Sequence, residues 1–303
     1  MSVALLCPGQ GAQHVGMGKD FCGRFGVAAR VFESADKALG FPLTRLCFEG
    51  PEDVLNKTNM AQLAIFVTSV AIFQSLLELG KAQKPDYAAG LSLGEYTALH
   101  LAGVFTFEDG LKIVKARGQL MQAAAEANPS TMLALIGADE PTASVICEEA
   151  REGDVLVPAN FNSPGQIVLS GAIAACERAV KVAETKGIRS MPLKVAGAFH
   201  SPFMQSAADQ MAQVLAGVSF SQPQVPVISN VTAQPHGSVE SIKELLVRQI
   251  VAPVRWQQSM ETLRAAGVNR WIEVGPGRSL TGMMKKIDRK AAVENYSVAE
   301  GLA

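Results

Sequence analysis

The sequence predicts an α/β protein that combines a larger domain around a mainly parallel sheet with a smaller inserted subdomain. Short apolar runs that end in glycine-rich turns, separated by long segments of helical periodicity, indicate the parallel sheet and its helices. The segment 128–197 instead reads as β-α-β-β-α-β, which is the order of a ferredoxin-like unit. We therefore expect residues 1–127 and 198–303 to form the large domain and residues 128–197 to form the insert.

The large domain opens with an apolar run at residues 3–7, which is typical of a strand and ends in the turn sequence Pro8-Gly9-Gln10-Gly11. Apolar residues recur at helical spacing from Leu63 to Leu77, and Gly80 follows where helices commonly end. Further along this first part, we expect a strand at residues 87–91 and helices at residues 93–101 and 107–126.

In the insert, we expect strands in TMLALIG, DVLVPANF, QIVLS and IRSMPL and helices at residues 141–152 and 172–186. The two middle strands are joined by Asn162-Ser163-Pro164-Gly165, residue types that favour a tight turn. Beyond the insert, Ser201 and Pro202 are typical of the first positions of a helix. Apolar runs at residues 225–229 and 271–274 predict two more buried parallel strands.

Composition excludes several classes of protein. Apolar residues make up 48% and charged residues 18%, which is ordinary for a globular protein and excludes disordered and fibrous chains. A net charge of −1 gives no general attraction to nucleic acid or to anionic lipid. The five cysteines show no metal-binding spacing, and the start of the chain lacks the features of a signal peptide. Because the apolar segment 63–79 contains polar residues, it predicts a buried helix without a membrane span. We expect a cytoplasmic protein, with an organellar one after processing as the alternative.

Ser92 is the first candidate for catalysis, because Gly90-Leu91-Ser92-Leu93-Gly94 spells G-x-S-x-G between a predicted strand and a predicted helix. In this context the motif predicts a nucleophile elbow, a tight turn that exposes the serine hydroxyl, as in α/β-hydrolase-like domains. The amides at the start of the following helix would stabilise a negatively charged oxygen. A small residue in an ordinary turn is the competing interpretation.

A serine nucleophile needs a base, and the chain has only four histidines. His100 is eight residues along the helix that Ser92 opens, roughly 12 Å away at the helical rise, and is therefore a poor base. His236 lies in a polar loop, and His14 follows the first turn. His200 lies between the predicted insert and a capped helix, which favours it as the partner of Ser92. No acidic residue is evident as a third member.

Six motifs in order resemble the malonyl-CoA:acyl carrier protein transacylases of type II fatty acid synthesis and the related acyltransferase domains of polyketide synthases. The resemblance covers essentially the whole chain. The motifs are Pro8–Gly11, Gly90–Glu95, Arg117–Met121, Asn160–Gln166, Gly197–Ser201 and Glu273–Gly277.

The resemblance implies a role for each matching position in the large catalytic domain. Ser92 would accept the malonyl group as an ester, and His200 would act as general base and then as general acid. The main-chain carbonyl of Gln249 would orient His200, which makes a dyad without a carboxylate. The backbone amides of Gln10 and Leu93 would form the oxyanion hole.

The resemblance also assigns residues to substrate binding. Arg117 would bind the free carboxylate of malonyl-CoA through charge-assisted hydrogen bonds, and Phe199 would exclude acyl groups with a branch next to the thioester. Asn160, Asn162 and Gln166 would line a polar acyl pocket, although the residue types also suit a turn. Gln62 would be a further pocket residue, within a stretch that departs from the usual family pattern.

Other departures bear on the mechanism. The family often has His where this chain has Leu91, and Ser where it has Ala12. Since His200 supplies a base, we interpret Leu91 as a packing position beside the nucleophile. A serine esterase or thioesterase, and a non-catalytic scaffold that binds carrier protein, remain alternative functions. Nucleotide binding at Gly9 and Gly11 is not expected, because His14 stands where the motif requires a third glycine.

The expected partners follow from the resemblance. They are a coenzyme A thioester and, transiently, an acyl carrier protein. We expect no metal or redox cofactor and no binding to nucleic acid or to a membrane. We also expect the enzyme to be a monomer. Lys285, Lys286, Arg289 and Lys290 form a basic cluster that could meet an acidic carrier protein or simply be a solvated surface. Whether the pathway is fatty acid or polyketide synthesis stays open.

Overall fold

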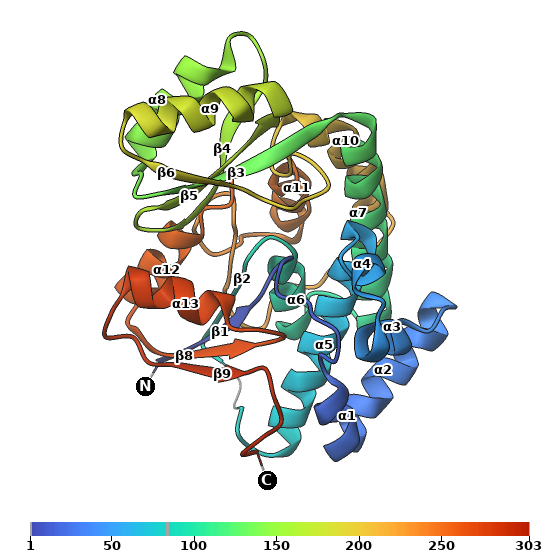
Figure 1. The fold of residues 1–303 in the computed structure, drawn as a ribbon. Coiled ribbons are helices and arrows are strands. Elements are labelled where there is room, and N and C mark those ends of the chain that lie inside the picture. Colours follow the sequence, from blue (N-terminus) through green and yellow to red (C-terminus); the bar gives the residue numbers. More distant parts are fainter. Residues whose placement is uncertain (1, 83–84, 303) are drawn as a thin grey trace. The chain divides into compact units, whose positions relative to one another are not determined.

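The computed structural model describes residues 2–82 and 85–302. The chain divides into two compact units (Figure 1). Unit 1 comprises Met1–Gly118, Val218–Ile228 and Leu263–Ala303, and unit 2 comprises Gln119–Gly217 and Ser229–Thr262.

Unit 1 is built on a five-stranded parallel sheet with the order β7-β2-β1-β8-β9. The first strand, β1, lies at its centre, and its last four residues are buried. Cys7 at the end of β1 pairs with Gly90 at the end of β2, so the turn after β1 and the turn after β2 begin at one edge of the sheet. The strands are β1 (Ser2–Cys7), β2 (Tyr87–Gly90), β7 (Val227–Ile228), β8 (Val268–Val274) and β9 (Val293–Tyr296).

Unit 1 also contains several helices. The longest helix that lies wholly in this unit is α5, and it is part of the core. α5 is long and apolar enough to cross a membrane by length and composition, but 83% of its most apolar window is buried inside the structure, as in the core helix of a globular protein. The helices are α1 (Lys19–Arg24), α2 (Gly26–Leu39), α3 (Leu43–Glu49), α4 (Glu52–Leu55), α5 (Thr58–Glu78), α6 (Leu93–Leu101), α13 (Ser279–Ile287) and the first part of α7 (Phe107–Ala127).

The motif Glu273–Gly277 serves the architecture of unit 1. Glu273 is the last residue but one of β8, and its carboxylate is fully buried. Its oxygens accept hydrogen bonds from the amides of Leu280 at 3.0 Å and Thr281 at 2.9 Å, which are donors in the first turn of α13. Asn295 of β9 donates to the same carboxylate at 3.1 Å. One side chain thus ties a strand, the next helix and the edge strand together.

Unit 2 contains a four-stranded antiparallel sheet with the order β4-β5-β3-β6. The elements follow the β-α-β-β-α-β order, which confirms the predicted ferredoxin-like subdomain. Helices α8 and α9 cover one face of this sheet and share its apolar core, which includes Leu133, Ile146, Leu169 and Ala179 (Figure 1). The elements are β3 (Ser130–Ile136), α8 (Glu140–Arg151), β4 (Leu156–Ser163), β5 (Gln166–Ala172), α9 (Ile173–Thr185) and β6 (Arg189–Pro192).

The remaining elements of unit 2 lie outside the predicted insert. They are the 3₁₀ turn η1 (Pro202–Met204) and helices α10 (Gln205–Ala216), α11 (Val239–Gln249) and most of α12 (Trp256–Ala265). The Ser201 hydroxyl accepts a hydrogen bond from the Phe203 amide at 3.3 Å, so this helix begins as expected but with a 3₁₀ turn. Unit 2 is therefore wider than residues 128–197, and the prediction that this segment is a domain of its own stays a prediction.

The expected strand at 225–229 was too long, since only Val227–Ile228 pairs with β2.

Candidate active site

Ser92 lies in a strained turn between β2 and α6. Its φ of 52° and ψ of −103° put a non-glycine residue in a region that side chains rarely adopt. Neighbouring glycines make the turn possible: a Cβ at Gly90 would overlap the backbone of Gly94, and a Cβ at Gly94 would overlap the carbonyl of Cys7. Both glycines of G-x-S-x-G are therefore required by close backbone approach, and the turn has the form expected of a nucleophile elbow.

Leu91 contributes its main chain to this turn. Its amide donates to the Cys7 carbonyl at 3.1 Å, and its carbonyl accepts from the Gly94 amide at 2.9 Å. A Cβ at Gly9 would overlap the Leu91 carbonyl, so the turn after β1 packs directly on the elbow. The Leu91 side chain is half-buried. Because the turn uses backbone groups at position 91, it accommodates a leucine where the family often has histidine.

Gln10 and Leu93, the residues assigned to an oxyanion hole, follow the ends of neighbouring strands. Leu93 is the first residue of α6, where helical amides have no partner within the helix. Gln10 lies in the turn after β1, and its side-chain Nε2 is 3.5 Å from Thr58 Oγ1. Their role in stabilising an oxyanion stays a prediction.

Arg117 brings a buried positive charge to the nucleophile. Only 1% of this residue is exposed. Its Nη2 donates to Ser92 Oγ at 3.0 Å, and its Nη1 donates to Gln62 Oε1 at 2.7 Å. A Cβ at Gly118 would lie 2.8 Å from Asn59 Cα, so the glycine after Arg117 lets α7 approach the start of α5. The structure thus brings Ser92, Arg117 and Gln62 together within unit 1.

Tyr96 and Glu95 complete the surroundings of the guanidinium, and the sequence analysis missed both. The Arg117 Cζ lies 4.9 Å from the centre of the Tyr96 ring, and both Tyr96 and Glu95 are fully buried. Burial lowers the pKa of Arg117, whereas Tyr96 and Glu95 act in the opposite direction. Burial also raises the pKa of Tyr96 to about 12, so its phenol stays protonated near neutral pH. The available signal was spacing, because Tyr96 is four residues after Ser92 on the same helix.

His200 in unit 2 is held by a main-chain carbonyl. Its Nδ1 is 2.7 Å from the carbonyl oxygen of Gln249, the last residue of α11. Since a carbonyl only accepts, Nδ1 carries the hydrogen, and in the neutral ring Nε2 is left as the proton acceptor. Carbonyls at the end of a helix have no intrahelical partner, which makes this one available. The contact is the one that the resemblance implied for Gln249.

The backbone around His200 is fixed by serine hydroxyls. His200 has a φ of 57°, which is unusual for a non-glycine residue. Ser170 of β5 donates to the carbonyl of Phe199 at 2.6 Å, and Ser201 donates to the carbonyl of Ala198 at 2.6 Å. The Ala198 amide in turn donates to Ser130 Oγ at 2.9 Å. These bonds hold Gly197–Ser201 in one conformation.

The other predicted pocket residues also lie in unit 2. Phe199 is buried next to His200, and Asn162 is buried near the end of β4 with no hydrogen-bond partner for its Oδ1 among the described residues. Asn160 forms an isolated bridge with Val254, and Gln166 begins β5 after the turn at Gly165. Their role in binding an acyl group stays a prediction.

The five cysteines are all free thiols of raised pKa. Burial raises the pKa of Cys7, and it raises those of Cys22, Cys47 and Cys147 to about 12 and that of Cys176 to about 11. No group of three or more His, Cys, Asp or Glu side chains that could hold a metal ion occurs within 2–82 and 85–302.

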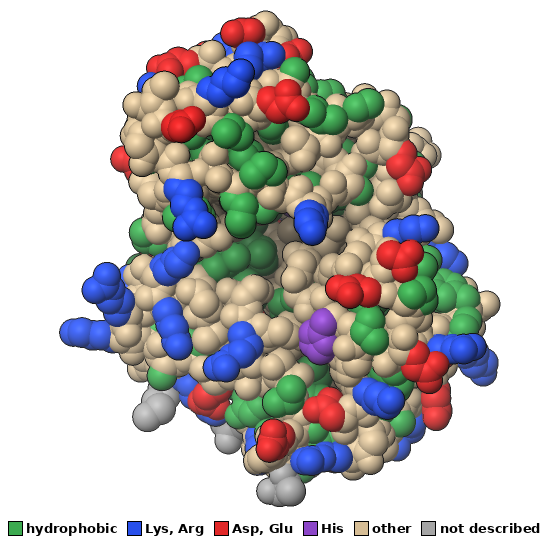
Figure 2. Space-filling model, viewed as in Figure 1, with side chains coloured by type: hydrophobic (Ala, Val, Ile, Leu, Met, Phe, Trp, Pro, Cys, Tyr) green, Lys and Arg blue, Asp and Glu red, His purple; other side chains and the backbone are tan. Residues whose placement is uncertain are grey.

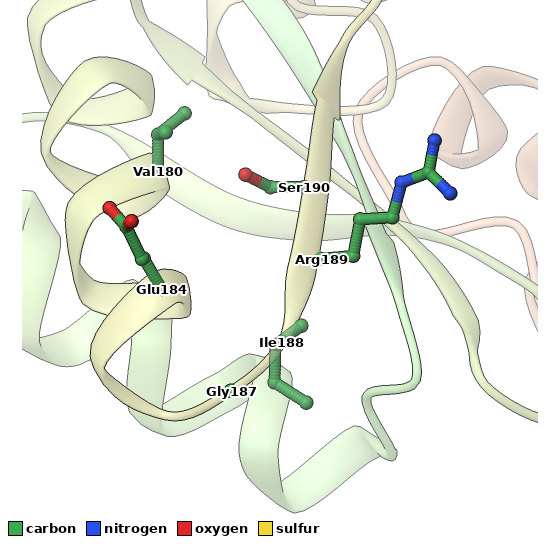
Figure 3. A pocket seen from close by; sticks show the side chains of 6 residues that line it. All are labelled: Val180, Glu184, Gly187, Ile188, Arg189 and Ser190. Carbon is green, nitrogen blue, oxygen red and sulfur yellow. The ribbon is translucent and has the colours of Figure 1, made fainter.

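Two surface features lie apart from these residues. Lys285, Lys286, Arg289 and Lys290 are exposed on and after α13, over which Lys and Arg side chains gather in Figure 2. A shallow cavity in unit 2 lies between α9, which contributes Val180 and Glu184, and β6, from which Ser190 points toward α9 and Arg189 points away (Figure 3). Ser190 supplies a hydroxyl there, but no histidine lines the cavity, so it lacks the base that a serine nucleophile needs.

Comparison with known proteins defines the class of this protein. The family model of the acyl transferase domain matches residues 4–301, and the chain therefore belongs to this family and is an acyltransferase. Its curated relatives include the malonyl CoA-acyl carrier protein transacylases of Escherichia coli K12, 42% identical over 94% of this chain and 92% of that protein, and of Bacillus subtilis 168, 41% identical over 95% and 91%.

Solved structures agree with this family. The malonyl CoA-acyl carrier protein transacylase of Coxiella burnetii superposes with a TM-score of 0.97 at 38% identity, over 100% of this chain and 96% of that chain. A malonyl-transacylase in complex with its type II PKS acyl carrier protein gives a TM-score of 0.96 at 40% identity, over 100% and 98%. The resemblance inferred from six motifs is thus confirmed.

Proposed function

We propose that this protein transfers a malonyl group from malonyl-CoA to the phosphopantetheine thiol of an acyl carrier protein through a malonyl ester of Ser92. The observation that carries the proposal is the hydrogen bond of 3.0 Å from the buried guanidinium of Arg117 to Ser92 Oγ. A guanidinium is the group best suited to bind a carboxylate, and malonyl-CoA differs from acetyl-CoA by a free carboxylate. A general hydrolase would not need a buried arginine beside its serine.

The first half-reaction acylates Ser92. The malonyl carboxylate accepts hydrogen bonds from Arg117, which places the thioester carbonyl near Ser92 Oγ. His200 Nε2 takes the hydroxyl proton while Oγ forms a bond to the carbonyl carbon. The amides of Gln10 and Leu93 stabilise the resulting oxyanion. The bond from carbon to sulfur then breaks, and His200 returns the proton to the departing coenzyme A thiolate.

The second half-reaction reverses these steps with a different thiol. After coenzyme A leaves, the phosphopantetheine thiol of the carrier protein gives its proton to His200 and attacks the ester carbonyl. The bond to Ser92 Oγ breaks, and Oγ regains a proton from His200. The acyl group thus passes through a covalent intermediate in a ping-pong sequence, with no metal or redox cofactor in any step.

Further proposed roles concern substrate choice. Phe199 excludes acyl groups that are branched next to the thioester, a discrimination worth about 1–3 kcal/mol for one methyl group. The amides of Asn160, Asn162 and Gln166 line the acyl pocket. Gln62 orients Arg117 through the bond of 2.7 Å between their side chains.

The partner and setting complete the proposal. The names of the relatives support an acyl carrier protein as acceptor and fatty acid synthesis as the pathway, with polyketide synthesis as the alternative. The basic cluster at Lys285, Lys286, Arg289 and Lys290 is the proposed docking surface; charge reversal there should raise the KM for carrier protein but spare transfer to free pantetheine. We further propose that the protein is a monomer. We also propose a cytoplasmic location, because five free thiols are typical of a reducing compartment.

The decisive experiment is covalent labelling. Incubation with radiolabelled malonyl-CoA should give an acid-stable protein adduct that is lost in Ser92→Ala and retained in the control Ser75→Ala, whose buried hydroxyl bonds to Ala71 in α5. An adduct that persists in Ser92→Ala would contradict the proposal. Release of free malonate without carrier protein, as fast as transfer, would instead identify a thioesterase.

A further inference from the structure

Tyr96 has a position that ordinary core packing does not require. It is the fourth residue of α6, four positions after Ser92, and residues at this spacing lie on the same side of a helix. The side chain is fully buried, yet it carries a hydroxyl that must find a polar partner there. Its neighbour on this side is the guanidinium of Arg117, on α7.

Two interactions join Tyr96 to Arg117. The Arg117 Cζ lies 4.9 Å from the ring centre, which is the range of a cation–π interaction. The two side chains are also hydrogen-bonded, with the guanidinium as the donor and the phenol oxygen as the acceptor. Both interactions are strengthened by burial, because water does not compete for either group.

Together with two other contacts, Tyr96 fixes the plane of the guanidinium. Nη1 of Arg117 donates to Gln62 at 2.7 Å and Nη2 donates to Ser92 at 3.0 Å. A guanidinium is rigid and planar, so two in-plane bonds and one aromatic face define its orientation. Without the aromatic face, the group could tilt about the line that joins Gln62 and Ser92.

We propose that Tyr96 is a positioning residue that makes the enzyme selective for acyl thioesters with a free carboxylate, by holding the guanidinium of Arg117 in the plane that such a carboxylate needs. This inference rests on the proposed function, in which Arg117 binds the malonyl carboxylate. Tyr96 itself does not touch the substrate. Its effect reaches the substrate only through Arg117, so an acyl group without a carboxylate does not depend on it.

The test compares malonyl-CoA with acetyl-CoA in two variants. Tyr96→Phe keeps the ring and removes the hydroxyl, and we expect kcat/KM for malonyl-CoA to fall about tenfold, as for loss of one hydrogen bond to a charged group. Tyr96→Leu removes both interactions, and we expect a fall of about 30-fold or more. Acetyl transfer should change by less than about twofold in Tyr96→Phe, since no carboxylate is present.

The control is Phe32→Leu, which removes a buried ring of unit 1 that packs on Phe48. We expect it to lower the melting temperature while the ratio of malonyl to acetyl transfer stays at the wild-type value. If Tyr96→Leu fails to fold, Tyr96→Phe decides alone. Free malonate as an inhibitor gives a second measurement: its inhibition constant should rise in Tyr96→Phe by the same factor as the loss in kcat/KM.

The outcomes separate this inference from the proposed function. If wild-type enzyme transfers malonyl groups through Ser92 but Tyr96→Phe leaves both the malonyl-to-acetyl ratio and the malonate inhibition constant unchanged, Tyr96 is only a core residue and the inference is overturned. If the wild-type enzyme forms no malonyl adduct, the proposed function itself fails before Tyr96 is tested. A selective loss of malonyl transfer that exceeds the change in acetyl transfer supports the inference.

Discussion

Ser92 in unit 1 is surrounded by side chains, whereas His200 in unit 2 is oriented by a main-chain carbonyl. The Ser92 hydroxyl accepts from Arg117, which in turn depends on Gln62 and the ring of Tyr96. The imidazole of His200 depends on the carbonyl of Gln249. A side-chain network can be broken by one substitution, but a carbonyl is present whatever the residue type. The two units should therefore respond differently to substitutions next to their reactive groups.

The largest effect on activity is expected when a reactive group itself is removed. His200→Ala removes the proposed base and should lower kcat for malonyl transfer by about 10³ to 10⁴, the upper range for a general base. The exposed His14→Ala is the control and should keep wild-type activity. Rates would be measured with carrier protein in excess. Activity of His200→Ala within tenfold of wild type would show that another group removes the proton.

Arg117→Ala should have the next largest effect on activity, and this effect should fall mainly on malonyl-CoA. Loss of the proposed partner of the malonyl carboxylate should lower kcat/KM for malonyl-CoA by about 10² to 10³, as for a buried hydrogen-bonded charge that loses its partner. Acetyl transfer should fall by less than about tenfold, because acetyl-CoA has no carboxylate to bind. Parallel assays with the two thioesters check this. Equal losses would exclude Arg117 from substrate recognition.

A matched pair of glutamines tests the comparison most directly. Gln62→Leu removes the acceptor of Arg117 Nη1 and should lower malonyl transfer about tenfold, because a buried charged donor loses its bond. Gln249→Leu keeps the carbonyl that holds His200 and should change kcat by less than about threefold.

The Gln249 side chain is buried and lies 3.5 Å from Asn230, so Gln249→Leu should lower the melting temperature nonetheless. Kinetics and thermal unfolding of both variants distinguish the two expectations. A fall in kcat for Gln249→Leu as large as that for Gln62→Leu would show that the side chain at 249 matters to His200 as well.

Leu91→His should have the smallest effect. The elbow uses the amide and carbonyl of Leu91, and the side chain is only half-buried. A histidine there should change kcat/KM by less than about threefold. A gain of tenfold or more would show that the leucine impairs the side-chain network around Ser92, and single-turnover acylation would detect it.

The two sheets differ in how far the sequence predicts them. The four strands of unit 2 are linked by a tight turn and by two helices of ordinary length, so local patterns predict their order. The parallel sheet of unit 1 pairs β1 with β2 and β8, segments far apart in the chain, and no local pattern specifies that pairing. The edge strand β9 was not predicted, because it mixes polar and apolar residues that are all half-buried. Helices α1–α4 and α11–α13 were also not predicted individually.

The candidate site shows the same limit. Ser92 could be predicted from its glycines, because close backbone approach restricts residue type at those positions. Arg117 alone looks like a solvated helix residue, and only its motif identified it. Gln249 holds His200 through a carbonyl that every residue has, so only the family resemblance, and no local pattern of residue types, indicated it. Tyr96 and Glu95 were missed because burial beside a charge is a property of the folded chain.

The pKa values of the cysteine thiols determine how readily they could accept an acyl group in place of the proposed acceptor. Thioesters exchange readily with thiolates, so an exposed cysteine of ordinary pKa could capture the acyl group that we propose for Ser92. A thiol with a pKa of about 12, as at Cys47 and Cys147, supplies only about one thiolate in 10⁵ at neutral pH. Cys7 lies fully buried just before the turn that holds Gln10, where such a side reaction would be most damaging. Raised thiol pKa values thus favour the proposed oxygen of Ser92 as the acyl acceptor in a protein whose two substrates are both sulfur compounds.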